Sequence, residues 1–134
     1  MQSFFARIVT GRGRGKAIGS PTLNLEPSDV PDDLEEGIYA CLVTVVDGRR
    51  HMVNHPAVMH HGPRPVFNDT PACEVHLLDE VLDTSPPSAT VEVVERLRAV
   101  ENFPSVEALQ AQIVEDIANA HTALARAETK ETHE

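Results

Sequence analysis

The chain has 134 residues, which is the length of one domain and enough to bury a hydrophobic core without disulfides or metals. Hydrophobic residues make up 41% of it but include only four Phe, one Tyr and no Trp, so we expect a core of Val, Leu, Ile and Ala. The net charge of −10 excludes general binding of nucleic acids or anionic membranes, because those surfaces require an excess of cations on the protein.

The first predicted strand, Ser3–Thr10, leads into a loop that is rich in glycine and positive charge. Four glycines and three cations lie within residues 11–19. The loop is not a Walker A motif, because its first glycine is one residue too close to Gly15 and Lys16 and because Ala17 replaces the hydroxyl residue. Its glycines would still let backbone amides turn toward a phosphate, with Lys16 as a point charge. A small-anion site and a mobile surface loop are both compatible with this segment.

The segment after the loop contains Pro21, which disfavours a helix. In an extended conformation Thr22 and Asn24 lie on one face, where a hydroxyl and an amide oxygen are suitable ligands for Mg²⁺. A turn closed by the Asn24 side chain is the alternative. Residues 26–36 are rich in proline and acidic side chains and predict an exposed loop.

The central segment Gly37–Gly48 predicts a buried strand, because alternate residues are apolar on both of its faces. The turn signal at Asp47 and Gly48 predicts an antiparallel return strand over residues 49–55. This part of the chain also holds four histidines, namely His51, His55, His60 and His61. Their irregular spacing and the interruption at Pro56 do not fit a metal site, so we expect none there.

The next predicted strand, Ala72–Glu80, carries Glu74 and His76 on one face. A carboxylate in an otherwise apolar strand requires an explanation. It is either a general base for a hydroxyl nucleophile or a structural partner of a cation, for which the candidates are Arg64 and Arg96.

A last strand is predicted at Ala89–Arg98, so that five strands precede any helix, which favours an antiparallel sheet or a small barrel. Cys41 and Cys73 lie in apolar segments without CxxC spacing and are expected to be buried free thiols. An apolar stripe then predicts one helix with Ser105 as its N-cap. The stripe consists of Val106, Leu109, Ile113, Ile117, Ala120 and Leu124. We expect one domain over residues 1–127 and a disordered tail over 128–134.

Taken together and in this order, these segments resemble the riboflavin kinase (flavokinase) family. The resemblance spans residues 4 to about 125. Its most specific part is the combination of P-T-x-N with E-x-H and L-R-x-x-x-x-F. The segments that carry it are "GRGRGKAIGSPTLNL" (11–25), "GIYACLVTV" (37–45), "PRPVF" (63–67), "CEVHLLD" (73–79) and "LRAVENF" (97–103), followed by the predicted helix.

The resemblance implies a mainly β fold, a six-stranded antiparallel Greek-key barrel with a C-terminal α-helix. It also implies Mg²⁺-dependent transfer of the γ-phosphoryl group of ATP to the 5′-hydroxyl of riboflavin, which gives FMN. Thr22 and Asn24 match the family's pair that contacts Mg²⁺ and phosphate, and Glu74 matches its catalytic base. Arg98 and Phe103 match the ends of the segment that closes over the flavin. The positions that match the nucleotide-binding loop are Gly11, Gly13, Gly15 and Lys16, together with Thr22.

Two departures from the family pattern concern the flavin side of the site. His60-His61-Gly62 stands where the family has N-I-G, and "LDTSPPSA" at 82–89 replaces an aromatic-rich turn. The alternative function is a divergent barrel that binds flavin or nucleotide without turnover. No segment is apolar for long enough to be a signal peptide or a membrane span, so we expect a soluble, cytoplasmic protein. We further expect a monomer with riboflavin and ATP as partners, no nucleic-acid or membrane partner, and no synthesis of FAD.

Overall fold

The computed structural model describes residues 2–9, 22–47, 50–62, 72–78, 86–101 and 103–132. These residues form six strands, one 3-10 helix and one α-helix. In chain order the elements are β1 (Gln2–Val9), β2 (Thr22–Leu25), the 3-10 helix η2 (Pro27–Asp29), β3 (Gly37–Asp47), β4 (Arg50–Gly62), β5 (Ala72–Leu77), β6 (Ser88–Arg98) and α1 (Val106–Thr132).

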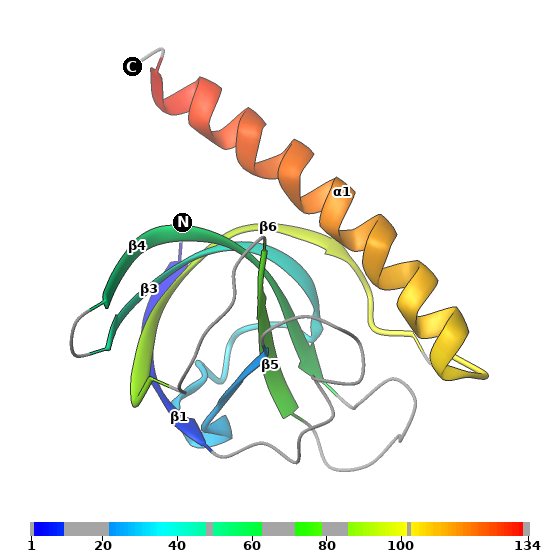
Figure 1. The fold of residues 1–134 in the computed structure, drawn as a ribbon, viewed down its shortest axis with the longest axis horizontal. Coiled ribbons are helices and arrows are strands. Elements are labelled where there is room, and N and C mark those ends of the chain that lie inside the picture. The colour runs from blue at the N-terminus through cyan, green and yellow to red at the C-terminus, as the bar shows by residue number, and fades with distance from the viewer. Residues whose placement is uncertain are drawn as a thin grey trace.

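The strands close into a barrel in the order β1-β2-β5-β4-β3-β6, and every neighbouring pair is antiparallel (Figure 1). β3, β4 and β5 are neighbours both in sequence and in the barrel, and β6 returns to lie beside β3. This is the strand order of a Greek key. The mainly β class, the six-stranded antiparallel barrel and the C-terminal helix expected from the sequence are confirmed.

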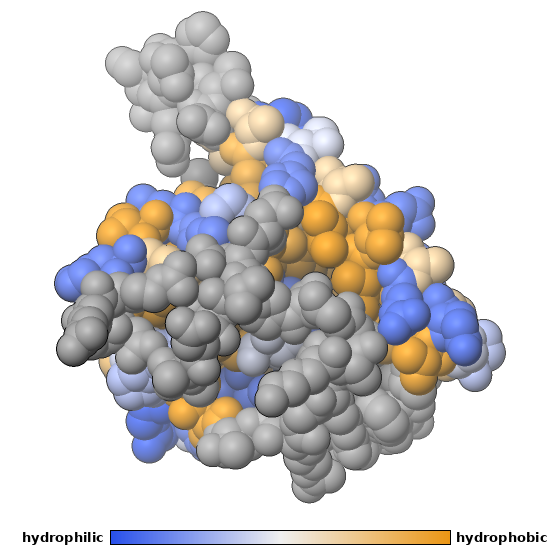
Figure 2. Space-filling model, viewed as in Figure 1, coloured by the Kyte–Doolittle hydropathy of each residue, from blue (hydrophilic) through white to orange (hydrophobic). Residues whose placement is uncertain are grey.

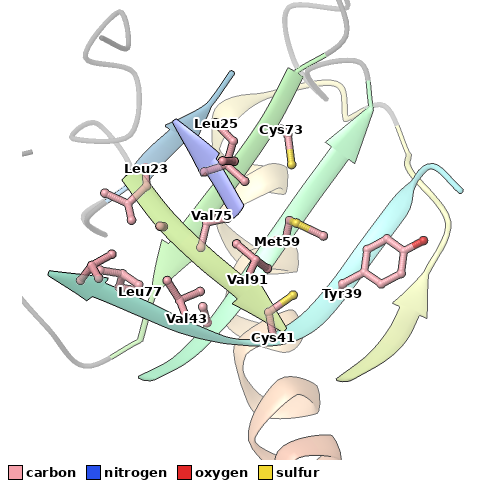
Figure 3. Close-up of a cluster of buried hydrophobic side chains, with 14 of the residues drawn as sticks. Leu23, Leu25, Tyr39, Cys41, Val43, Met59, Cys73, Val75, Leu77 and Val91 are labelled. Carbon is pink, nitrogen blue, oxygen red and sulfur yellow. The ribbon is translucent and has the colours of Figure 1, made fainter. Parts of the chain in front are cut away.

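The interior of the barrel is filled by side chains from every strand, most of them aliphatic (Figure 3). Cys41 and Cys73 belong to this core as buried free thiols, as predicted. Burial raises the pKa of the Cys73 thiol to about 12 and that of Cys41 further still. Because the interior is occupied by the core, polar side chains that bind a ligand must lie on the outer surface of the barrel.

β3 is apolar on both faces because each face packs against a different part of the molecule. Its inward side chains, which include Cys41 and Val43, join the barrel core. Its outward side chains Ile38 and Ala40 form a second cluster beneath α1. The other buried members of that cluster are Val58, Leu78, Ala120 and Ala123.

β4 is longer than the predicted return strand, because it continues through Pro56 to Gly62. A register shift in its pairing with β3 lies between Val43 and Val45, opposite Asn54, which has a positive φ of 52°. This bulge inserts one extra residue, so Met52 and Ala57 both face the core although strict alternation would place them on opposite faces. The bulge breaks the two-residue alternation near His55, where the predicted strand ends.

α1 begins as predicted, with the Ser105 Oγ accepting a hydrogen bond from the Ala108 backbone N–H at 3.1 Å. The helix lies across β3, β4 and β6 on the outside of the barrel (Figure 1), and hydrophobic surface gathers along it where it meets the barrel (Figure 2). Val106, the first residue of the predicted stripe, is instead 42% exposed. The helical backbone continues to Thr132, past residue 127, where the sequence placed the end of the domain.

Candidate active site

Two adjacent strands bring Thr22, Asn24 and Glu74 together on the outer surface. Asn24 on β2 pairs with Glu74 on β5, and Thr22 pairs with His76. Directly paired residues of antiparallel strands project from the same face of a sheet. Their strand neighbours Leu23, Leu25, Cys73 and Val75 are buried in the core, so these four polar side chains face outward. The two-residue period used in the sequence analysis is therefore confirmed for Thr22, Asn24 and Glu74.

Thr22 is held by a buried histidine. Its Oγ1 lies 3.1 Å from the Nδ1 of His76. Burial lowers the pKa of His76 to about 4, although the negative charge of Asp116 acts in the opposite direction. The imidazole is therefore neutral at pH 7. In the tautomer protonated on Nε2, Nδ1 accepts a hydrogen bond from the Thr22 hydroxyl, which fixes the orientation of that hydroxyl. The sequence placed His76 on this face but assigned it no role.

A second cluster joins β6 to α1 around Arg98. Its Nε and Nη2 donate to the two carboxylate oxygens of Asp116, both at 2.9 Å, and its Nη1 donates to the Ala99 carbonyl at 2.9 Å. The guanidinium carbon lies 5.7 Å from the centre of the Phe103 ring, within the range of a cation–π contact. These contacts bring the two predicted flavin residues, Arg98 and Phe103, together.

Asp116 is the central residue of this second cluster and was not singled out from the sequence. It is only 3% exposed and also accepts a hydrogen bond from Gln112 at 3.1 Å. The hydrogen bonds that Arg98 donates to Asp116, together with the charge of that carboxylate, raise the pKa of Arg98 against the opposing effect of burial. A signal was present, because Asp116 lies three residues after Ile113 and four before Ala120, within the apolar stripe of the helix.

The two clusters lie on the same face of the barrel wall and are linked by a row of paired residues. From Glu74 on β5 the row passes to His60 on β4, then to Ile38 on β3 and to Arg98 on β6. His60 is buried between the clusters, and it is part of the His60-His61-Gly62 departure noted in the sequence. Gly11, Gly13, Gly15 and Lys16 lie outside the described residues.

The donor set of the first cluster suits a magnesium ion bound together with phosphate. Thr22 and Asn24 offer a hydroxyl and an amide oxygen, both of which are hard oxygen ligands, and Glu74 lies directly opposite Asn24. Within the described part of the chain, no group of three or more His, Cys, Asp or Glu side chains could hold a metal ion. Arg96, considered as a partner of Glu74, donates to the Glu36 carbonyl at 2.9 Å, and Arg64 lies outside the described residues.

Comparison with known proteins identifies the family of the chain. The family model for flavokinase, described as riboflavin kinase, matches residues 2–124. The chain belongs to the riboflavin kinase family. This flavokinase domain is 32% identical over 125 residues to human riboflavin kinase, covering 87% of the chain and 78% of the human protein. It is also 32% identical over 117 residues to the bifunctional riboflavin kinase/FMN adenylyltransferase of Haemophilus influenzae, covering 87% of the chain. The flavokinase domain spans about a third, 36%, of the length of that bifunctional relative.

Two solved structures share the fold of the flavokinase domain. The crystal structure of riboflavin kinase from Trypanosoma brucei superposes with a TM-score of 0.64 at 21% identity, covering 98% of this chain and 85% of that one. A structure described as a macrolide-efflux protein from Streptococcus pneumoniae superposes with a TM-score of 0.68 at 26% identity, covering 89% and 38%. No helix among the described residues combines the length and apolar character that a membrane span requires.

Proposed function

We propose that this domain is a riboflavin kinase, which transfers the γ-phosphoryl group of ATP to the 5′-hydroxyl of riboflavin and releases FMN and ADP. The observation that carries the proposal is the position of Glu74 directly opposite Asn24, beside Thr22. A carboxylate next to a pair of neutral oxygen donors fits a base that receives a hydroxyl proton where a phosphate is held.

In the proposed reaction the 5′-oxygen bonds to the γ-phosphorus while the bond from that phosphorus to the bridging oxygen of ADP breaks. The hydroxyl proton passes to the carboxylate of Glu74. Thr22 and Asn24 orient the phosphate end of the nucleotide, and His76 fixes the Thr22 hydroxyl. Mg²⁺ bound with ATP would neutralise charge on the phosphate oxygens. Positioning and charge neutralisation account for most of the acceleration in such reactions, so the side chains need only be well placed.

We assign the loop residues Gly11, Gly13, Gly15 and Lys16 to the nucleotide and Arg98 with Phe103 to the flavin. Because the Arg98 guanidinium is already bound to Asp116 and the Ala99 carbonyl, we assign it the role of holding Phe103 beside the flavin. We further propose that the domain works as a monomer in the cytoplasm.

The test is direct. Purified protein is incubated with riboflavin, ATP and Mg²⁺, and FMN is separated by chromatography. We expect FMN from the wild type, and a kcat lowered about 10²- to 10⁴-fold in Glu74→Gln, which keeps the shape of the side chain but cannot accept the proton. Riboflavin binding by the variant, measured by flavin fluorescence quenching, should persist. Saturable binding of riboflavin by the wild type without FMN under any nucleoside triphosphate would identify a non-catalytic binding protein and refute the kinase assignment.

A further inference from the structure

Among the residues that the structure describes, the buried polar side chain of His60 finds no hydrogen-bond partner. It is 8% exposed, and neither Nδ1 nor Nε2 is within hydrogen-bonding range of a partner among the residues the structure describes. Buried polar groups in folded proteins are almost always paired, because an unpaired one loses its bonds to water without replacement. An imidazole with both nitrogens unpaired at this depth therefore requires an explanation.

The imidazole of His60 is neutral at pH 7. Burial is the main cause, and the charges of His76 in its protonated form and of Arg98 act in the same direction, so that the pKa of His60 is lowered to about 4. A neutral imidazole presents one N–H donor and one lone-pair acceptor. Such a group does not favour an anion such as phosphate over a neutral ligand. It matches alcohols, because each hydroxyl both donates and accepts a hydrogen bond.

The position of His60 specifies which part of a substrate reaches it. On one side its paired residue is Glu74, and on the other side the row continues through Ile38 to Arg98. Neighbouring strands are about 4.8 Å apart, so His60 lies one strand from the proposed base and two strands from the proposed flavin cluster. A ligand with its reacting hydroxyl at Glu74 and its ring at Phe103 would cross the barrel wall near His60, beside the part of β3 that α1 covers at Ile38. In riboflavin the part between those two ends is the ribityl chain.

We propose that His60 is a specificity-determining residue that hydrogen-bonds the hydroxyl groups of the ribityl chain. This inference rests on the proposed function, because it takes Glu74 and Phe103 as the two ends of the riboflavin site. It gives the unpaired nitrogens of His60 partners in the substrate complex. It also gives a function to the replacement of the family's asparagine at this position, since both residues can donate one hydrogen bond and accept another.

The experiment compares two flavins on three variants. His60→Leu removes both nitrogens while keeping an apolar side chain, and His60→Asn keeps one donor and one acceptor. His51→Leu is the control, because His51 is exposed near the hairpin end of the same strand. Affinities for riboflavin and for lumiflavin, which lacks the ribityl chain, are measured by fluorescence quenching, together with the Tm and the KM for riboflavin.

We expect His60→Leu to weaken riboflavin binding about tenfold to a hundredfold, as for the loss of hydrogen bonds to a desolvated group. Lumiflavin affinity should be unchanged, His60→Asn should recover part of the riboflavin affinity, and His51→Leu should match the wild type. The Tm of His60→Leu should be unchanged or higher, because two unpaired nitrogens are removed from a buried position. A purely structural role for His60 would not give an unchanged or higher Tm together with weaker binding of riboflavin alone.

Unchanged riboflavin affinity in His60→Leu would overturn the proposal, and so would an equal loss for both flavins, which would place His60 against the ring. If His60→Leu does not fold, the comparison of His60→Asn with the wild type decides, since a larger effect on riboflavin than on lumiflavin supports the contact and equal effects refute it. If the wild type binds riboflavin but forms no FMN, the kinase assignment fails and the binding comparison still tests His60. If the wild type binds no riboflavin, both proposals fail.

Discussion

The ion pair between Arg98 and Asp116 should make an unusually large contribution to stability for a pair linking a helix to a barrel. The side chains are 20% and 4% exposed, and two hydrogen bonds of 2.9 Å join them. Removing one partner of a buried pair costs about 3–5 kcal/mol, because the other charge is left uncompensated. Arg98 keeps some exposure and its bond to Ala99, so we expect Asp116→Ala to cost about 2–3 kcal/mol of unfolding free energy. In a domain of this size that corresponds to a Tm lower by roughly 10 °C.

The chain offers a matched control between the same two elements. Arg126 on α1 and Glu95 on β6 also form an ion pair at 2.9 Å, but their side chains are 62% and 43% exposed. Exposed pairs contribute about 0–1 kcal/mol, so Glu95→Ala should lose at most that amount. Urea unfolding followed by circular dichroism measures both variants. Equal losses, or a loss below about 1 kcal/mol in Asp116→Ala, would refute the reasoning that burial gives the Arg98 pair its strength.

A double replacement separates stability from binding. Arg98→Met with Asp116→Leu removes both charges, and apolar replacement of a buried pair is often neutral or stabilising. We therefore expect most of the lost stability to return in the double variant. Riboflavin binding by the double variant should nevertheless be weaker than that of the wild type if Arg98 holds Phe103 beside the flavin. A methionine cannot make the hydrogen bond to the Ala99 carbonyl or the cation–π contact with Phe103.

Three further predictions concern the metal ligands, a histidine and the thiols. Asn24→Ala should raise the Mg²⁺ and ATP concentrations needed for half-maximal FMN formation and leave riboflavin quenching unchanged; a variant with unaltered Mg²⁺ dependence would remove Asn24 from the metal site. The pKa of His60 is lowered to about 4 from an ordinary value of 6.5, so the unfolded chain binds more protons at this residue between those values. The unfolding free energy therefore decreases as pH falls from about 6.5 to 4. The unfolding free energy of His60→Leu should accordingly fall less steeply than that of the wild type over that range, and parallel curves would contradict the burial of a neutral imidazole. Cys41 and Cys73 should not react with a thiol reagent in the native protein at pH 8 and should react fully in denaturant, because burial keeps both thiols protonated. Rapid reaction of both thiols in the native protein would disprove their burial.

Much of the fold was predictable because its signals are local. Period-two alternation predicted the common face of Thr22 and Asn24. The placement of strands before a single helix favoured an antiparallel sheet or a small barrel, and the family resemblance implied the six-stranded barrel. Ser105 was recognisable as an N-cap because a serine before an apolar stripe satisfies a backbone donor at the helix start. These features depend on residues within one element, and such patterns survive folding unchanged.

The site was harder to predict because it depends on pairing between distant strands. No local pattern indicates that Asn24 meets Glu74, or that His60 lies between Glu74 and Arg98, since these contacts depend on pairing between strands that are distant in the chain. Asp116 was missed for a different reason. Its carboxylate is buried inside an apolar stripe, and its partner lies on β6, so helical periodicity alone gives it no role.

The two apolar faces of β3 have a consequence for how the barrel reaches its native pairing. A strand with one polar face is penalised for slipping by a single residue, since its hydrophobic side chains would then turn toward water. β3 lacks that penalty, because a one-residue slip would exchange one apolar face for another. The bulge at Asn54 fixes the alignment of β3 with β4 instead, because the Asn54 backbone N–H donates a hydrogen bond to the Thr44 hydroxyl at 3.1 Å. A hairpin whose hydrophobicity tolerates two alignments thus has its alignment chosen by one irregular residue, which makes Asn54 a determinant of folding fidelity far from any ligand.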